Sequence, residues 1–313
     1  MPNSTPEHLR ERRAARRRDV RRRRLGAVVA LVIVAGGVVA VIAAGGGGGG
    51  GASPAAGGAT GAKPNSSGKP ESASSLVRNA HPQPDWKPDT GPVPILEYHV
   101  LGAPIPGAPY PDLFVTRPKF RAEMNWLDRH GYQAVTLDQV EKSWYHGGTL
   151  PPKPVVLTFD DGYRPQYTFA LPQLRKHGWA GVLNLKAKGA APCPDLCQSQ
   201  VKTMIRAGWE LAAHTINHLD LTTLDSSSLK HEVAGSRYIL RAAYDVPVNN
   251  FCYPAGRFDS TVIAAVKAAG FTGATTEISG FASRQRPYEL DRFEVLGSYG
   301  TSDLAQFLQS GGA

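Results

Sequence analysis

The chain has 313 residues, of which 42% are hydrophobic and 19% charged, a composition that supports a folded domain and excludes a wholly disordered protein. The formal net charge is +9, but residues 1–24 hold ten arginines against three acidic residues and so contribute +7 of it. The rest of the chain is nearly neutral and has no basic patch with interleaved aromatic residues, so we expect no nucleic-acid partner.

The N-terminal third predicts a membrane partner. Residues 1–24 are a basic tail, and residues 25–44 are twenty residues without a charge, long enough to span a bilayer with the positive flank in the cytoplasm. We therefore expect an uncleaved transmembrane signal-anchor helix. A cleaved signal peptide and secretion are the alternative, because Ala43-Ala44 and Ala55-Ala56 offer small residues.

Residues 45–91 are rich in Gly, Ala, Ser and Pro and nearly lack large apolar side chains, which predicts a flexible linker. The linker leads into a folded domain of residues 92–313, expected outside the cell membrane.

Residues 92–313 read as alternating strands and helices. Four helix-like segments end in glycine followed by an aromatic residue and an apolar run, as at Gly131-Tyr132, Gly178-Trp179, Gly208-Trp209 and Gly270-Phe271. A further helix is expected to start at Thr116, with Pro118 in its first turn. Strands are expected at 94–100, 132–136, 154–159, 180–185, 209–214, 250–253 and 271–276, with 290–296 as a possible eighth. This repeat predicts one α/β barrel of about seven parallel strands, and a flat doubly wound sheet is the alternative.

The chemistry-bearing residues follow predicted strands. Asp160 and Asp161 end an apolar strand before Gly162, and His214 ends another, with His218 four residues on. Two adjacent carboxylates and two histidines supply three ligands for a divalent metal with one carboxylate left over. Alone, an Asp pair before glycine is usually a turn or a helix cap. In a parallel barrel, however, the C-terminal strand ends form one face, where His99 and the segment Tyr253–Gly256 would also lie.

These residues resemble the polysaccharide deacetylases with a NodB homology domain, also called carbohydrate esterase family 4. Thr158-Phe159-Asp160-Asp161-Gly162 is similar to the first motif of that family, and His214-Thr215-x-x-His218 is similar to the second. Pro94-Ile95-Leu96-Glu97-Tyr98-His99 resembles the branch that acts on poly-N-acetylglucosamine, and the resemblance covers roughly residues 92–300. It implies a distorted (β/α) barrel, Asp161, His214 and His218 as metal ligands, and Asp160 as catalytic base.

Two departures from the family pattern matter. The third motif of the family usually has an arginine where this chain has Cys252, and the usual late histidine is missing because no histidine follows His231. We expect Arg292 to replace the absent arginine by contacting Asp160, with Arg257 as the rival and a surface position for Arg292 as the alternative. By elimination among the nine histidines, His99 is the expected general acid, and a histidine hydrogen-bonded in the barrel rim is the alternative.

The expected reaction is hydrolysis of an acetamide on an N-acetylated polysaccharide, such as the amino sugars of a cell wall or exopolysaccharide. Zinc is the expected metal for a site of two histidines and one carboxylate. A backbone N–H of the Tyr253, Pro254 and Gly256 loop is expected to hold the oxyanion. A glycan-binding module without turnover and a metal hydrolase of a non-sugar acyl group are the alternatives.

The three cysteines suggest two environments. Cys193 and Cys197 lie in one loop, and in an exported protein they favour a local disulfide. Cys252 has no obvious mate and is expected to be a small buried side chain. Neither the glycan nor the oligomeric state can be read from the sequence.

Overall fold

The computed structural model describes residues 76–188 and 195–311. The predicted tail, the predicted transmembrane segment 25–44, most of the predicted linker and Cys193 lie outside these ranges. Within them, no helix combines the length and the apolar character needed to cross a membrane.

The centre of the fold is a parallel sheet of eight strands. Seven follow the order β10-β1-β5-β6-β7-β8-β9, and β4 pairs with β5. The strands are β1 (Ile95–Tyr98), β4 (Gln133–Val135), β5 (Pro154–Asp160), β6 (Val182–Leu185), β7 (Glu210–Ala213), β8 (Asn250–Cys252), β9 (Gly273–Thr275) and β10 (Phe293–Glu294). All eight fall where the sequence predicts strands. A separate short pair is formed by β2 (Val100–Leu101) and β3 (Phe114–Val115).

The sheet curls into a half-barrel because its last segment touches both ends of the strand order. Leu290 bridges to Thr275 in β9, and three residues later Phe293 pairs with Leu96 in β1. The curled sheet confirms the barrel-like prediction over a flat doubly wound sheet. It also places Arg292 at the seam, between β9 and β1.

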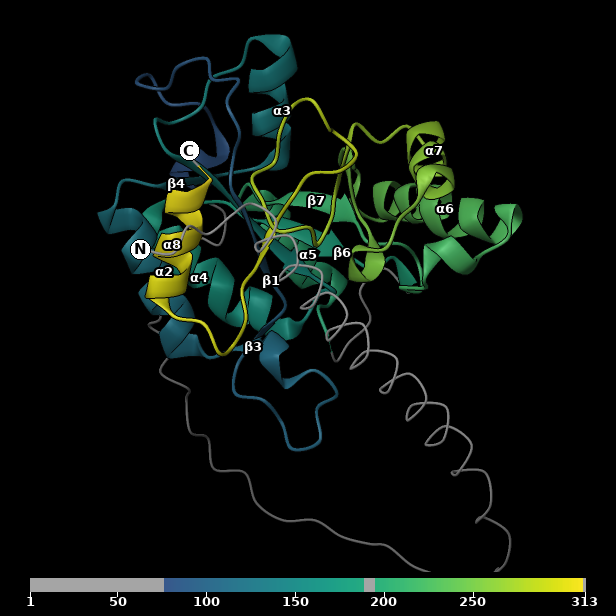
Figure 1. Ribbon diagram of the computed structural model, residues 1–313, viewed down its shortest axis with the longest axis horizontal. Coiled ribbons are helices and arrows are strands. Elements are labelled where there is room, and N and C mark those ends of the chain that lie inside the picture. Colours follow the sequence, from purple (N-terminus) through teal and green to yellow (C-terminus); the bar gives the residue numbers. More distant parts are fainter. Residues whose placement is uncertain (1–75, 189–194, 312–313) are drawn as a thin grey trace, which may run out of the picture. The chain divides into compact units, whose positions relative to one another are not determined.

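Helices surround the sheet (Figure 1). They are α2 (Arg117–Arg129), α3 (Leu137–His146), α4 (Leu171–His177), α5 (Gln198–Arg206), α6 (Ser226–Tyr244), α7 (Ser260–Ala268) and α8 (Thr301–Ser310). Short helical turns are η1 (Arg78–Ala80), η2 (Pro111–Leu113), η3 (Gln166–Ala170), η5 (Leu221–Thr223) and η6 (Pro254–Gly256). The four glycines expected to stop helices all have positive φ angles. Thr116 precedes α2 as predicted, but its side chain makes no capping hydrogen bond.

The two faces of the sheet have different surroundings. Successive side chains of a strand point to opposite faces, so alternate residues share a neighbourhood. One set packs into the main hydrophobic cluster and includes Leu96, Tyr98, Leu157, Phe159, Leu183 and Phe251. The alternate set begins in a second apolar cluster, with Ile95, Val156, Val182 and Ala212, and continues along the same strands as Glu97, Thr158, Asp160, Asn184 and Cys252. This second face is apolar at the starts of β1, β5 and β6, but it carries the buried polar residues Glu210 and Asn250 at the starts of β7 and β8. It is polar again at the carboxyl ends, where the candidate site lies.

Candidate active site

The three predicted metal ligands come together at the carboxyl ends of β5 and β7. Asp161, His214 and His218 each offer one atom, and these atoms lie within 4.8 Å of one another. The Nε2 atoms of His214 and His218 lie 3.9 and 3.6 Å from Asp161 Oδ1. Ligands about 2 Å from a tetrahedral zinc ion would be about 3.3 Å apart, so small movements fit these residues to such an ion.

Two of these ligands are held in a backbone conformation that non-glycine residues rarely adopt. The φ angles are 74° at Asp161 and 59° at His218, and Thr215 between the histidines has 62°. His218 N donates to Thr215 Oγ1, and the Glu232 carboxylate of α6 accepts the N–H groups of Ile216 and Asn217. These hydrogen bonds hold the loop that carries His218 in its unusual backbone conformation.

His214 is prepared as a neutral ligand. Its Nδ1 lies 2.9 Å from the carbonyl oxygen of Cys252, which can only accept, so Nδ1 carries the proton and Nε2 keeps a lone pair toward Asp161. Burial and the neighbouring His218 lower the pKa of His214 to about 4. The ring is therefore uncharged at neutral pH.

Asp161 also has a cation beside it. Lys186, directly after β6, places its Nζ 3.2 Å from Asp161 Oδ1. Burial alone raises the pKa of Asp161, but His214, Lys186 and the other nearby histidines lower it below its usual range. Asp161 is thus held as an anion, as a metal ligand requires.

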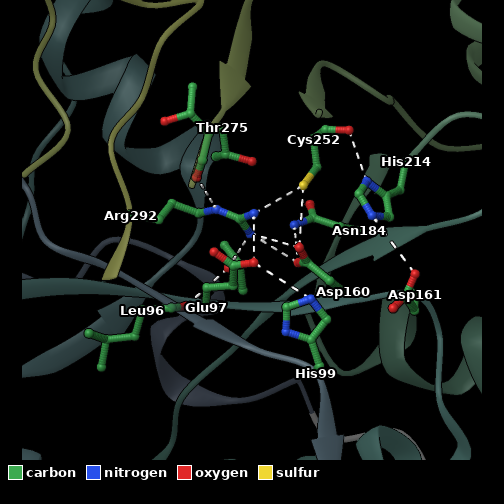
Figure 2. A network of polar contacts seen from close by, with 12 residues as sticks. Leu96, Glu97, His99, Asp160, Asp161, Asn184, His214, Cys252, Thr275 and Arg292 are labelled. Carbon is green, nitrogen blue, oxygen red and sulfur yellow. Dashed lines mark hydrogen bonds and ion pairs between the residues drawn. The ribbon is translucent and has the colours of Figure 1, made fainter. Parts of the chain in front are cut away.

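Asp160 faces a different set of partners (Figure 2). It is almost fully buried; Arg292 Nη1 donates to both of its carboxylate oxygens at 3.0 Å, and Asn184 Nδ2 donates to Oδ1 at 2.6 Å. Burial raises the pKa of Asp160, but Arg292 and, after it, His214 lower it well below its usual range. Asp160 is thus an ionised carboxylate with partners different from those of Asp161, as expected for neighbouring residues that leave a strand, and one of its oxygens lies within 4.8 Å of a ring nitrogen of His214.

A second geometric grouping, Asp160, His214 and Cys252, is a poorer metal site. Burial raises the pKa of the Cys252 thiol well above its usual value, whereas a metal ligand must be a thiolate. Both oxygens of Asp160 are already engaged by Arg292. The chemistry of the donors therefore favours the set of Asp161 with the two histidines.

The expected contact between Arg292 and Asp160 is present, and the surface alternative for Arg292 is wrong because its side chain is only 1% exposed. Arg292 also donates to Thr276 O and to Thr158 Oγ1. The rival, Arg257, pairs with Asp220 at the surface instead.

We expect Arg292→Met to move the acid limb of the pH–rate profile to higher pH by roughly 1 to 3 units, because the cation that lowers the Asp160 pKa is gone. Loss of one partner of a buried ion pair is also expected to destabilise the fold by about 3 to 5 kcal/mol. Rate measurements against pH and thermal unfolding test both effects. Arg257→Met is the matched control, and an acid limb common to both variants would contradict the assignment.

His99 lies at the same end of the sheet, just after β1. Its Nε2 is 3.6 Å from Glu97 Oε1 and its Nδ1 is buried without a hydrogen-bond partner among the described residues. Gln166 Nε2 donates to the carbonyl oxygens of both His99 and Asp160, which ties the two strand ends together. The position suits a general acid, and that role stays a prediction.

The prediction that a backbone N–H of the loop from Tyr253 to Gly256 holds the oxyanion needs correction for two of these N–H groups. The N–H of Tyr253 donates to Thr275 O in the sheet, and the N–H of Gly256 donates to Tyr253 O. Pro254 has no N–H to offer. Neither the Tyr253 nor the Gly256 N–H is therefore a free donor, because the sheet and the turn that follows it already use them.

The cysteines differ as expected. Cys197 is disulfide-bonded, while Cys252 is a buried free thiol. Cys252 is more than a packing residue, since its Sγ lies 3.4 Å from Asp160 Oδ2 and 3.3 Å from Arg292 Nη2.

Five residues of the site were not singled out from the sequence: Glu97, Gln166, Asn184, Lys186 and Glu232. For two of them a signal existed, because Glu97 and Asn184 interrupt otherwise apolar strands, Ile95–Tyr98 and Val182–Leu185. A polar residue within a buried strand must find a partner there. Gln166 and Glu232 lie on helical segments, where a polar residue is common and carries no such signal.

The chain resembles known proteins in sequence and in fold. Residues 147–274 match the family model for polysaccharide deacetylases. This part of the chain carries the signature of the polysaccharide deacetylases. Over 219 residues it is 29% identical to YxkH of Bacillus subtilis (strain 168), whose naming as a polysaccharide deacetylase is provisional, and the match covers 70% of this chain and 76% of that protein.

A shorter match is closer in sequence. Over 62 residues the chain is 44% identical to the poly-β-1,6-N-acetyl-D-glucosamine N-deacetylase of Escherichia coli (strain K12), covering 20% of this chain and 9% of that protein.

Solved structures share the fold. The deacetylase PplD of Streptococcus pyogenes, in complex with acetate, superposes with a TM-score of 0.65 at 24% identity, covering 70% of this chain and 99% of that chain. A de-N-acetylase from Aggregatibacter actinomycetemcomitans gives a TM-score of 0.61 at 20% identity, covering 69% and 100%.

Proposed function

We propose that this protein is a divalent-metal-dependent deacetylase that removes acetyl groups from an N-acetylated polysaccharide. The observation that carries the proposal is that the two adjacent aspartates at the end of β5 have different partners. Asp161 faces two histidines in a metal-ligand arrangement, whereas the adjacent Asp160 is an ionised carboxylate fixed by Arg292. Such a pair suits hydrolysis by an activated water.

The residues have distinct tasks in this mechanism. Asp161, His214 and His218 would hold a divalent ion, with zinc as first candidate, and such an ion would supply a Lewis acid and make a water molecule more acidic. Asp160 takes the proton of the attacking water, and Arg292 keeps Asp160 ionised beforehand. His99 gives a proton to the amine as it leaves.

The N-acetyl polysaccharide is supported by the relatives rather than by a readable sugar pocket. The Escherichia coli relative is named for N-deacetylation of poly-β-1,6-N-acetyl-D-glucosamine, and a structural neighbour is named a de-N-acetylase. The contact between Arg292 and Asp160 weakens the case for an inactive glycan-binding module, since Arg292 supplies the cation that the third motif of this chain lacks.

The test is acetate release by the purified full chain from a panel of N-acetylated cell-wall and exopolysaccharide glycans, with a non-sugar N-acetyl amide as comparison. We expect acetate from at least one glycan, loss of activity on chelation, and recovery with zinc. Acetate from no glycan in the metal-loaded protein would refute the proposal, and turnover of the simple amide alone would favour the non-sugar hydrolase.

We further propose that residues 1–24 stay in the cytoplasm, that residues 25–44 anchor the chain, and that the linker 45–91 holds the deacetylase domain 92–313 outside the membrane. Ten arginines before a charge-free run support this orientation. Protease added to intact spheroplasts should remove the domain and spare the extreme N-terminus. A mature N-terminus between residues 40 and 60 would instead establish cleavage and secretion.

A further inference from the structure

Glu97 is a buried carboxyl group in β1 that the proposed mechanism does not use. Its side chain is 1% exposed, and neither of its oxygens accepts a hydrogen bond from any described residue. Its Oε1 nevertheless lies 3.1 Å from Arg292 Nη2 and 3.6 Å from His99 Nε2. Figure 2 shows the three groups meeting beside Asp160.

The charges at this point do not balance if Glu97 is ionised. Arg292 is one cation between two carboxyls, and Asp160 holds it through contacts to both oxygens with further support from Asn184. Burial raises the pKa of Glu97 well above its usual value, and the opposing effect of Arg292 is smaller. A buried carboxylate needs a compensating cation, and the second basic group in contact with Glu97 is the imidazole of His99.

We propose that Glu97 is a positioning residue that shares a proton with His99 and thereby keeps the general acid supplied. The proposal rests on the proposed function of His99. When the Glu97 carboxyl holds the proton, its O–H faces His99 Nε2. When the proton is on Nε2, the Glu97 carboxylate is the counter-ion of the imidazolium. Contact between the two groups thus makes both states accessible without an unpaired buried charge.

The proton balance of one turnover closes. The bond from a His99 nitrogen to its proton breaks as the leaving amine gains that proton, and the Glu97 O–H proton then passes to the imidazole. The proton that the attacking water gave to Asp160 returns to the Glu97 and His99 pair. Water supplies all atoms added to acetate and amine, and the side chains end as they began.

Other charged groups around Glu97 affect whether its carboxyl group is protonated. Asp160, Glu277 and Glu294 all raise its pKa, and Cys252 lies next to the same guanidinium. Glu294 is the register partner of Glu97 on β10, so it faces the same side of the sheet. The acidic surroundings favour the protonated form of Glu97 whenever His99 is neutral.

The test is Glu97→Gln in the full chain, with Glu123→Gln as matched control. Glu123 on α2 is just as buried and accepts a hydrogen bond from Tyr98, the residue between Glu97 and His99. Among the described residues, however, Glu123 forms no hydrogen bond or ion pair with Arg292 or His99. Glutamine keeps the shape of Glu97 and cannot pass on a proton. We expect Glu97→Gln to lower kcat on the N-acetyl glycan by about 10²-fold with little change in KM, and to spare an activated aryl acetate.

A second readout does not depend on turnover. In a pH titration followed by NMR, the midpoint of the His99 ring signal should move to lower pH by about one unit in Glu97→Gln, because the counter-ion of the imidazolium is gone. Glu123→Gln should leave the midpoint in place, and Glu97→Asp should restore part of the activity. Failure of the wild type to release acetate would refute the proposed function, while this titration would still test the pairing.

The proposed pairing of Glu97 with His99 is overturned if the two variants, Glu97→Gln and Glu123→Gln, have the same titration midpoint for the His99 ring and the same pH–rate profile. Equal losses on the glycan and the aryl acetate would overturn it as well, since a proton donor matters most for a poor leaving group. Should Glu97→Gln fail to fold, the same comparison is made with Glu97→Asp, whose shorter side chain must also shift the His99 midpoint.

Discussion

Asp160→Asn is expected to abolish acetate release while the protein keeps its full complement of metal. The carboxylate that accepts the proton of the attacking water is lost, and removal of an acid–base group costs roughly 10²- to 10⁴-fold in rate, with the upper end expected here. Arg292 retains Glu97 as an ion-pair partner, so we expect the fold to persist. Metal analysis and acetate assays of the same preparation measure both effects.

The matched comparison is the neighbouring residue. Asp161→Asn, and likewise His214→Ala or His218→Ala, should lose metal and activity together, because each removes one of the three converging donors. Loss of stoichiometric metal in Asp160→Asn would show that the roles of the two aspartates are reversed. Asp160→Asn and Asp161→Asn change the same residue type at adjacent positions. A difference between their metal contents therefore reports the different directions of the two side chains.

His99→Ala should keep the metal and the fold but lose roughly 10²- to 10⁴-fold in turnover of the N-acetyl glycan, since the amine must be protonated to leave. An activated aryl acetate has a good leaving group and should be spared. The measurement is the ratio of the two rates in wild type and variant. His146→Ala, at the exposed end of α3, is the control for removing a histidine away from the site.

Two outcomes would count against His99. Equal loss on both substrates would indicate a structural role, consistent with a rim histidine held by Gln166 and Glu97. Turnover of the glycan close to wild type would mean that another group protonates the amine.

The sequence alone predicted the strands of the sheet, the helix stops at glycine and the candidate metal ligands, because these depend on local patterns. An apolar run ending at Asp160 predicts a buried strand whose polar end reaches the rim, and glycine after a helix predicts its stop. His214 and His218 are close in the chain, so their proximity to each other needs little from the rest of the fold. Adjacent residues leaving a strand must diverge, which predicts different roles for Asp160 and Asp161.

Only the tertiary structure decided which side chains contact Asp160 and which backbone N–H groups are already hydrogen-bonded. Arg292 lies 132 residues away and reaches Asp160 because the last strand closes the curl of the sheet at β1. The Tyr253 N–H donates a hydrogen bond to Thr275 O in β9, and this bond depends on which strands are neighbours rather than on residue type. Glu97 shows the same limit: alternation along a strand fixes the face of a side chain, but its partners come from other strands, and their register is a property of the assembled sheet.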